Sequence, residues 1–317
     1  MTLQPSIAVI FRTHFWDDFC QRQLSRLRQV ADGTDIFVLV DETHGPVTVT
    51  DDAKLVRVTD DSLLALGLAR AGEGALLWFN GDYPLYGFIA EHPGYDYYLQ
   101  LEYDVLINRP IAGLIADIAR QNLDYVGLTK QERPLEWFWL HTMLGAYPRP
   151  AIRNQLICLS IFSNAALRHL SGARLAQSEA WRAGDLVSWP FCEGFIPTEL
   201  HDAGFACAEL SAFGRTEAYD HWPPYLESDI AGLAQEEFVH PVLDPERYVA
   251  SMQKYHVGLS GYLNPNSQFH RKLRRLPPRA YAAALCKSFV AKSRRSLRQM
   301  AARLVPARAA SQGVVGR

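Results

Sequence analysis

A buried β-strand that ends in acidic side chains is encoded by Tyr97-Tyr98-Leu99-Gln100-Leu101-Glu102-Tyr103-Asp104-Val105. Side chains alternate between the two faces of a strand, so Glu102 and Asp104 should point the same way. Two carboxylates held this close repel each other unless a cation or a proton lies between them. Mg²⁺ and Mn²⁺ prefer oxygen ligands and commonly bind one or two carboxylates together with substrate phosphates. The stretch therefore predicts a metal site at Glu102 and Asp104, although a solvated acidic loop after a strand has the same pattern.

The surrounding sequence alternates apolar strands with helices. Three short apolar runs lie at 7–11, 36–40 and 54–58. Continuously apolar strands that alternate with helices are typical of a mainly parallel sheet flanked by helices on both faces. Ligands of such open α/β sheets bind beyond the carboxyl ends of the strands. Arg12, Asp41 and Asp60 follow the three runs, so we expect their side chains at a ligand crevice.

The acidic pair resembles the D-x-D motif of glycosyltransferases with the GT-A fold, in which two acidic residues after the fourth strand chelate the metal bound to a nucleotide-sugar diphosphate. This chain has E-Y-D, a departure at the first position that keeps the charge and lengthens one side chain. The stretches Phe79–Pro84, Tyr95–Tyr98 and Glu102–Val105 also resemble a group of transferases in that superfamily, and the resemblance extends over residues 6–245. It implies a GT-A-like fold, Mn²⁺ or Mg²⁺ as cofactor, a nucleotide-sugar donor, and a glycan or lipid-linked acceptor.

The same resemblance implies where the nucleotide binds. Members of the superfamily hold the base and ribose with the end of the first strand and an acidic residue after the second or third strand. The matching residues, with neighbours that would line the same pocket, are Arg12, Thr13, Asp41, Asp60, Asn80, Asp82 and Tyr103. Arg12 would also suit a core carboxylate as its partner, and Asn80 and Asp82 would also suit a turn or helix cap.

Two residues further along the chain are candidates for chemistry. Glu193 lies in the apolar, aromatic loop Trp189–Thr198, where partial desolvation would raise its pKa toward the range of a general base. Many inverting members of the superfamily place a catalytic carboxylate at such a helix start, which favours inversion, although Glu193 would also suit a helix cap or an arginine partner. His240 resembles the late histidine that some members use as a metal ligand, although a lone histidine near apolar residues is more often structural.

Composition limits the class of protein. The chain has 317 residues, of which 48% are hydrophobic and 21% charged, as in globular proteins. No apolar run reaches the roughly 18–20 residues of a membrane-spanning helix. The N-terminus lacks the charged flank and apolar core of a signal peptide. The five cysteines are odd in number and show no C-x-x-C spacing, as expected for reduced thiols. We therefore expect a cytoplasmic protein.

Charge divides the chain sharply. Residues 1–246 contain 17 basic and 34 acidic residues, whereas residues 247–317 contain 15 basic and no acidic residues. The acidic body disfavours nucleic-acid binding. The globular pattern ends near residue 260, so we predict a catalytic domain at 1–260 and a basic helical tail at 261–317. Within the tail, residues 279–305 repeat apolar side chains among cations, as in amphipathic helices that lie on anionic membranes.

The tail has more than one candidate partner. An anionic membrane would place the protein peripherally on the inner face of the plasma membrane, where lipid-linked acceptors are found. Docking on the acidic body of the same protein, or RNA binding without a visible RNA module, would also suit the charge.

The leading functional hypothesis is a metal-dependent glycosyltransferase, with inversion favoured. A nucleotidyltransferase would also use acidic metal ligands, but Arg12-Thr13-His14-Phe15-Trp16 lacks the Gly-rich phosphate loop expected after the first strand. A catalytically inactive, membrane-attached adaptor with a transferase-like core is the non-enzymatic alternative. The absence of G-x-G-x-x-G disfavours a dinucleotide-dependent dehydrogenase.

The tail hypothesis predicts that a chain ending near Leu263 loses binding to anionic vesicles. Each surface cation contributes about 1 kcal/mol of attraction to acidic lipid, and most cations of the tail lie beyond this point. Co-sedimentation of the full and shortened chains with anionic vesicles measures the effect, with neutral vesicles as the control. Unchanged sedimentation of the shortened chain would discard the membrane hypothesis.

Overall fold

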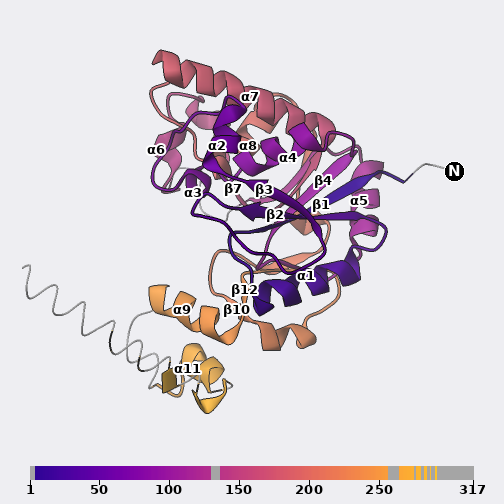
Figure 1. Cartoon of the computed structure of the whole chain (residues 1–317), viewed down its shortest axis with the longest axis vertical. Coiled ribbons are helices and arrows are strands. Elements are labelled where there is room, and N and C mark those ends of the chain that lie inside the picture. Colours follow the sequence, from indigo (N-terminus) through magenta and orange to yellow (C-terminus); the bar gives the residue numbers. More distant parts are fainter. Residues whose placement is uncertain are drawn as a thin grey trace, which may run out of the picture. The chain divides into compact units, whose positions relative to one another are not determined.

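A computed structural model of the chain (Figure 1) describes residues 4–129, 136–255, 264–274, 276–279, 282–283, 286 and 290. The chain divides into two compact units, Met1–Val242 and Leu243–Arg317. The division falls at residue 242, whereas the sequence places the end of the catalytic domain at 260. Apart from a few positions, the predicted amphipathic stretch 279–305 lies outside the described residues, so it stays a prediction.

A seven-stranded sheet with the order β3–β2–β1–β4–β7–β6–β8 forms the centre of the first unit. Its strands are β1 (Ile7–Thr13), β2 (Asp35–Asp41), β3 (Lys54–Val58), β4 (Tyr97–Glu102), β6 (Tyr125–Thr129), β7 (Gln155–Ser163) and β8 (Cys207–Glu209). The strands pair in parallel except at β7, which runs antiparallel to both β4 and β6. The predicted α/β class with a mainly parallel sheet is confirmed.

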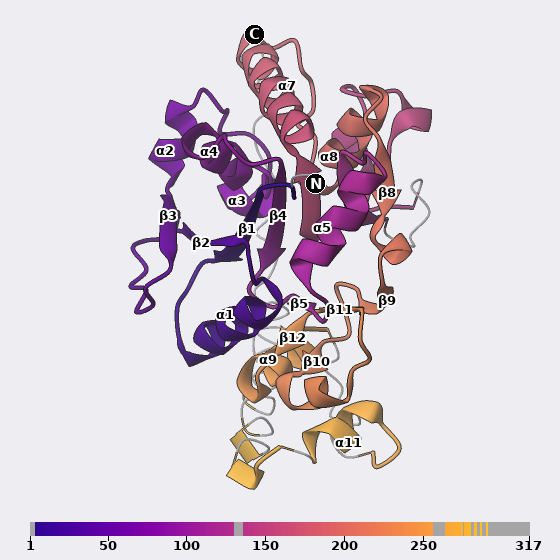
Figure 2. The ribbon, with the colours of Figure 1, turned by 90° about the vertical axis from the view of Figure 1, so that its right-hand side faces the viewer.

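Helices cover both faces of this sheet. Their bounds are α1 (Asp18–Val30), α2 (Asp60–Ala65), α3 (Leu76–Phe79), α4 (Tyr83–Glu91), α5 (Ile111–Arg120), α6 (Leu140–Met143), α7 (Asn164–Ala183) and α8 (Cys192–Asp202). One core layer joins α1 and α5 to alternate strand residues such as Val9 and Leu99. The other joins α2, α3, α4, α7 and α8 to the intervening residues such as Ile10 and Tyr98. Figures 1 and 2 show α1 on the opposite side of β1 and β2 from α2 and α4.

The chain returns toward the end of β4 through a small second sheet. It contains β5 (Leu106–Ile107), β11 (Glu237–His240) and β9 (Arg215–Tyr219), in that order. Tyr225 of β10 (Tyr225–Leu226) donates its N–H to the carbonyl of Pro241, and β12 (Val242–Leu243) follows directly. Short 3₁₀ segments lie at Arg149–Ala151, Leu210–Ala212 and Glu227–Gly232.

The second unit includes α9 (Pro245–Tyr255) and α11 (Gln268–Leu273). Among the described residues, no helix has the length and apolarity to cross a membrane.

A buried ion pair ties α4, α7 and the start of α8 together. Arg174 donates from Nε to Asp82 over 2.7 Å, and both side chains are 0% exposed. Tyr86 donates its hydroxyl to the same Asp82 oxygen, and Arg174 also donates to the carbonyl of Pro190. The guanidinium is thus paired and hydrogen-bonded, as a buried charge must be.

The pair predicts a large stability loss when its acidic partner is removed. Asp82→Ala should lower the free energy of unfolding by about 3–5 kcal/mol, because it leaves the Arg174 charge buried without a counter-charge. Urea unfolding followed by circular dichroism measures the loss. Asp185→Ala removes an exposed carboxylate and should change stability by no more than about 0.5 kcal/mol. A loss for Asp82→Ala as small as that of the control would contradict the prediction.

Candidate functional site

The ends of β1 and β4 lie side by side and set the centre of the site. Arg12 is the register partner of Glu102, and the Tyr103 N–H donates to the Arg12 carbonyl over 3.0 Å. The Arg12 guanidinium donates from one nitrogen to two neutral acceptors, the Gly81 carbonyl at 2.7 Å and Gln100 Oε1 at 2.5 Å. Its position is therefore fixed by neutral groups, and its positive charge stays available to an anionic ligand.

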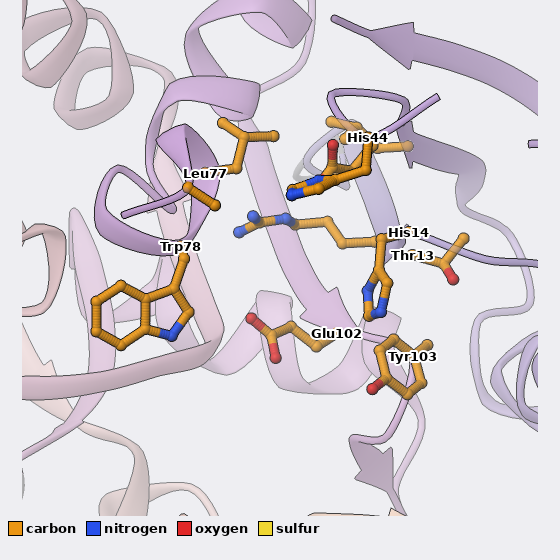
Figure 3. A pocket seen from close by; sticks show the side chains of 11 residues that line it. Thr13, His14, His44, Leu77, Trp78, Glu102 and Tyr103 are labelled. Atoms are coloured by element: carbon orange, nitrogen blue, oxygen red, sulfur yellow. The ribbon is translucent and has the colours of Figure 1, made fainter. Parts of the chain in front are cut away.

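A cavity of about 290 Å³ opens at this edge of the sheet (Figure 3). Its lining residues are Arg12, Thr13, His14, Leu39, Asp41, His44, Ala75, Leu77, Trp78, Glu102 and Tyr103. Four of the residues predicted to bind nucleotide therefore meet here (Arg12, Thr13, Asp41 and Tyr103), together with one predicted metal ligand. Figure 3 shows the Glu102 carboxylate between Trp78 and Tyr103. The volume is near the lower end of small-molecule sites, which span about 300–1,000 Å³.

The other three residues predicted to bind nucleotide have structural partners and do not line this cavity. Asp60 begins α2 directly after β3 and pairs with Arg70. Asn80 is fully buried; it donates to the carbonyls of Ala71 and Leu76 and accepts from Trp189. Asp82 is held by Arg174, as described above. The sequence shows these polar residues near strand ends, but their partners come from distant segments that local patterns do not reveal.

Two of the three predicted metal ligands, Glu102 and His240, come together in one cluster, and the third, Asp104, adjoins His240. Ligand atoms of Glu102, Cys158 and His240 all lie within 4.8 Å of one another. Asp104 Oδ1 lies 3.7 Å from His240 Nε2, and these two side chains are 11% and 8% exposed. Two groups that each bind one ion at about 2.1 Å can lie at most about 4.2 Å apart, so the Asp104–His240 separation fits a shared cation.

Asp104 reaches His240 through a turn and a short ladder. β4 ends at Glu102, and the Val105 N–H donates to the Glu102 carbonyl, so Asp104 lies in a turn and not on the strand. The chain then enters β5, which pairs antiparallel with β11 just before His240. The Val242 N–H closes the arrangement by donating to the Asp104 carbonyl over 2.7 Å. Turn geometry, and not strand alternation, therefore brings Asp104 to His240.

The imidazole of His240 is oriented by a backbone carbonyl. Its Nδ1 lies 2.7 Å from the carbonyl oxygen of Asp220, which can only accept a hydrogen bond. In the neutral ring Nδ1 therefore carries the proton, and Nε2 keeps its lone pair on the side of Asp104. Histidine ligands in metal sites are commonly oriented by such a second partner. Two carboxylates and a neutral imidazole form a donor set that suits Mn²⁺.

The cluster also contains a thiol that sequence patterns do not reveal. Leu101 pairs with Leu159 in the antiparallel β4–β7 ladder, which brings Cys158 opposite Glu102. Burial raises the pKa of the Cys158 thiol well above its ordinary value, and nearby carboxylates, including that of Glu193, raise it further. Glu193 itself is half-buried in the first turn of α8. The predicted base is thus within electrostatic range of the cluster.

Sequence reasoning also missed His14, His44 and Trp78 in the cavity lining. His14 directly follows Thr13, so extending the strand-end rule by one residue would have found it. Cys158 and Trp78 carry no local signal, because only the sheet order and the helix packing bring them to this edge.

No protein-family model matches the chain, and a search of curated proteins gives no match. Among solved structures, the chain is similar to the apo form of mouse xyloside xylosyltransferase 1, with 12% sequence identity and a TM-score of 0.41. The likeness covers 75% of this chain and 97% of that protein. A similarity this weak assigns no activity to the chain.

The geometry predicts that His240→Ala weakens Mn²⁺ binding. We expect a loss of about 10–100-fold or more, the range caused by removing even an outer partner of a metal ligand. Electron paramagnetic resonance of free Mn²⁺ measures the dissociation constant. His201→Ala, at the exposed end of α8, should bind Mn²⁺ like the parent. Equal affinities for the two variants would remove His240 from the ligand set.

Proposed function

We propose that this chain is a metal-dependent glycosyltransferase of GT-A-like architecture that moves a sugar from a nucleotide-sugar donor to a glycan or lipid-linked acceptor. One observation carries the proposal: Glu102 both lines the cavity and belongs to the cluster with His240. A nucleotide in the cavity would direct its diphosphate toward the cluster. When bound, a cation held by Glu102, Asp104 and His240 would supply electrostatic stabilisation to the departing diphosphate.

Side chains around the cavity suit the donor. The Arg12 charge, held by neutral acceptors, would bind a phosphate oxygen. Thr43 donates its N–H and hydroxyl to Asp41 Oδ1, and we assign the other oxygen of Asp41 to a ribose hydroxyl. Tyr103 packs edge-on against His14 and Phe15, with ring centroids 5.6 and 4.8 Å away, and gives the nucleobase an aromatic wall.

Thr13 has a positioning role in this proposal. Its hydroxyl donates to the Phe15 carbonyl over 2.6 Å and accepts from the Phe15 N–H at 3.3 Å. The side chain therefore shapes the turn after β1 that presents His14 and Phe15. We assign it to the wall of the nucleotide site through this turn.

Glu193 is assigned as the general base. Its carboxylate would take the proton of an acceptor hydroxyl as that oxygen attacks the anomeric carbon. The new C–O bond would form opposite the bond to the diphosphate, which breaks with its electron pair leaving on the phosphate oxygen. This geometry inverts the anomeric configuration.

An aromatic rim beside the cavity suits the acceptor. Trp78 lines the cavity and is 58% exposed. Its ring centroid lies 5.3 Å from that of Trp139, which packs edge-on against Phe138 at 4.7 Å; Phe138 is 72% exposed. Sugar rings pack their apolar faces on such exposed aromatic rings. We therefore assign the rim to the acceptor sugar.

The proposal predicts Mn²⁺-dependent release of a nucleoside diphosphate from one member of a nucleotide-sugar panel. EDTA should abolish the release, and Asp104→Asn should lower its rate by about 100-fold or more, because the leaving group loses electrostatic stabilisation. Glu193→Gln should lower the rate of transfer to an acceptor by about 10²–10⁴-fold and leave Mn²⁺-dependent binding of nucleoside diphosphate unchanged.

Chromatography of the released nucleoside diphosphate and calorimetry of its binding measure these effects. Asp61→Asn, an exposed carboxylate of α2, is the matched control and should behave like the parent. Hydrolysis by Asp104→Asn as fast as by the parent would sink the metal assignment.

A further inference from the structure

Cys158 is a member of the donor cluster that the proposed reaction does not use. Its sulfur lies within 4.8 Å of ligand atoms of both Glu102 and His240, and its residue is only 9% exposed. The residue belongs to β7, which is hydrogen-bonded on both sides within the central sheet. The sheet therefore fixes the backbone of Cys158, and the thiol can move only by rotation about the Cα–Cβ bond.

The chemistry of a thiol differs from that of the other donors. Mn²⁺ and Mg²⁺ prefer oxygen ligands, whereas Zn²⁺, Co²⁺ and Cd²⁺ bind thiolate and imidazole well. Glu102, Cys158 and His240 bring a carboxylate, a thiol and an imidazole within 4.8 Å of one another, and the Asp104 carboxylate adjoins them 3.7 Å from His240 Nε2. Four protein donors are the number that a closed tetrahedral Zn²⁺ site contains, whereas catalytic sites keep one position open.

We propose that Cys158 makes this cluster a dual metal site: a hard cation leaves the thiol uncoordinated, whereas Zn²⁺ or a similar ion recruits Cys158 as a fourth ligand and closes the site. As the metal–sulfur bond forms, the S–H bond breaks and its proton passes to solvent, with no change of oxidation state. The closed site has no position for a diphosphate oxygen. Inhibition of transfer by Zn²⁺ rests on the proposed function, whereas thiolate coordination does not.

Two donors of the cluster, Cys158 and His240, are held in place by the surrounding structure, which favours metal binding by the thiol. Cys158 is held by β7, and His240 is held by β11 and by the bond from Nδ1 to the Asp220 carbonyl. Glu102, half-buried at the end of β4, has the longer and freer side chain. Its carboxylate already lies within 4.8 Å of the other two, so Asp104, 3.7 Å from His240 Nε2, is the donor that would move to complete the set of four.

Titration of the full metal-free chain with Co²⁺ tests the coordination. The parent should show an intense thiolate-to-Co²⁺ charge-transfer absorption in the near ultraviolet, which Cys158→Ser should lose. Zn²⁺ affinity of Cys158→Ser should fall by about 10-fold or more, while Mn²⁺ affinity stays within about 2-fold of the parent, which also shows that the variant is folded. Cys207→Ser, a half-buried cysteine on β8, should retain both the band and the Zn²⁺ affinity.

Absence of the charge-transfer band in the parent would overturn the proposal whatever the variants do. Equal Zn²⁺ affinity of Cys158→Ser and Cys207→Ser would overturn it as well. In the activity arm, stoichiometric Zn²⁺ added to the Mn²⁺-loaded protein should inhibit donor hydrolysis by the parent and not by Cys158→Ser. A chain that shows the Co²⁺ band but hydrolyses no nucleotide sugar would disprove the proposed function and leave the thiolate site established.

Discussion

The short ladder between β5 and β11 is the constraint on which the candidate site depends. Val239 pairs with Leu106, and the N–H groups of Asn108 and Val242 donate to the carbonyls of Glu237 and Asp104. These bonds hold His240 beside Asp104, although most of the first unit lies between them in the chain. Closing so long a loop costs conformational entropy that grows slowly with its length. Burial of apolar residues such as Phe238 and Val239, both 0% exposed, offsets that cost. The cluster of Glu102, Cys158 and His240 therefore forms only when the whole unit is folded.

Electrostatics explains why this edge of the sheet should bind both a cation and an anion. Glu102 and Asp104 place two carboxylates against a histidine in a region largely closed to water, where their repulsion is weakly screened. Arg12 brings a positive charge to the same edge, where it donates to the uncharged acceptors Gly81 and Gln100. In the proposed function, a divalent ion would relieve the carboxylate repulsion, and a diphosphate would pair with both the ion and the guanidinium. The opposite charges of the site are thus complementary to a metal diphosphate and less well matched to either component alone.

Local sequence patterns predicted the layers of the fold, because continuous apolar strands such as β1 and β4 can only be buried between two layers of helices. They also predicted Arg12, Asp41 and Glu102 at one edge, since parallel strands end together. Other features depend on partners far away in the chain. Asp82 was predicted to line the nucleotide pocket, yet its partner is Arg174 on α7. Arg174 is fully buried in a helix whose sequence gives no sign of it. Cys158 likewise becomes a cluster member only because β7 inserts antiparallel beside β4.

The turn after β4 gives a physical reason for a glutamate at position 102 and an aspartate at position 104. Because the strand stops at Glu102, the turn carries Asp104 inward to His240, where its residue is only 8% exposed. Position 102 remains at the strand end, opposite Arg12 and Cys158, and has to serve both the cavity and the cluster. An aspartate there would have a side chain one methylene shorter, and its carboxylate would stay close to the strand. The extra length of glutamate lets one carboxylate face the cavity while remaining within reach of His240. A glutamate at position 102 and an aspartate at position 104 therefore suit the unequal depths at which the turn places the two residues.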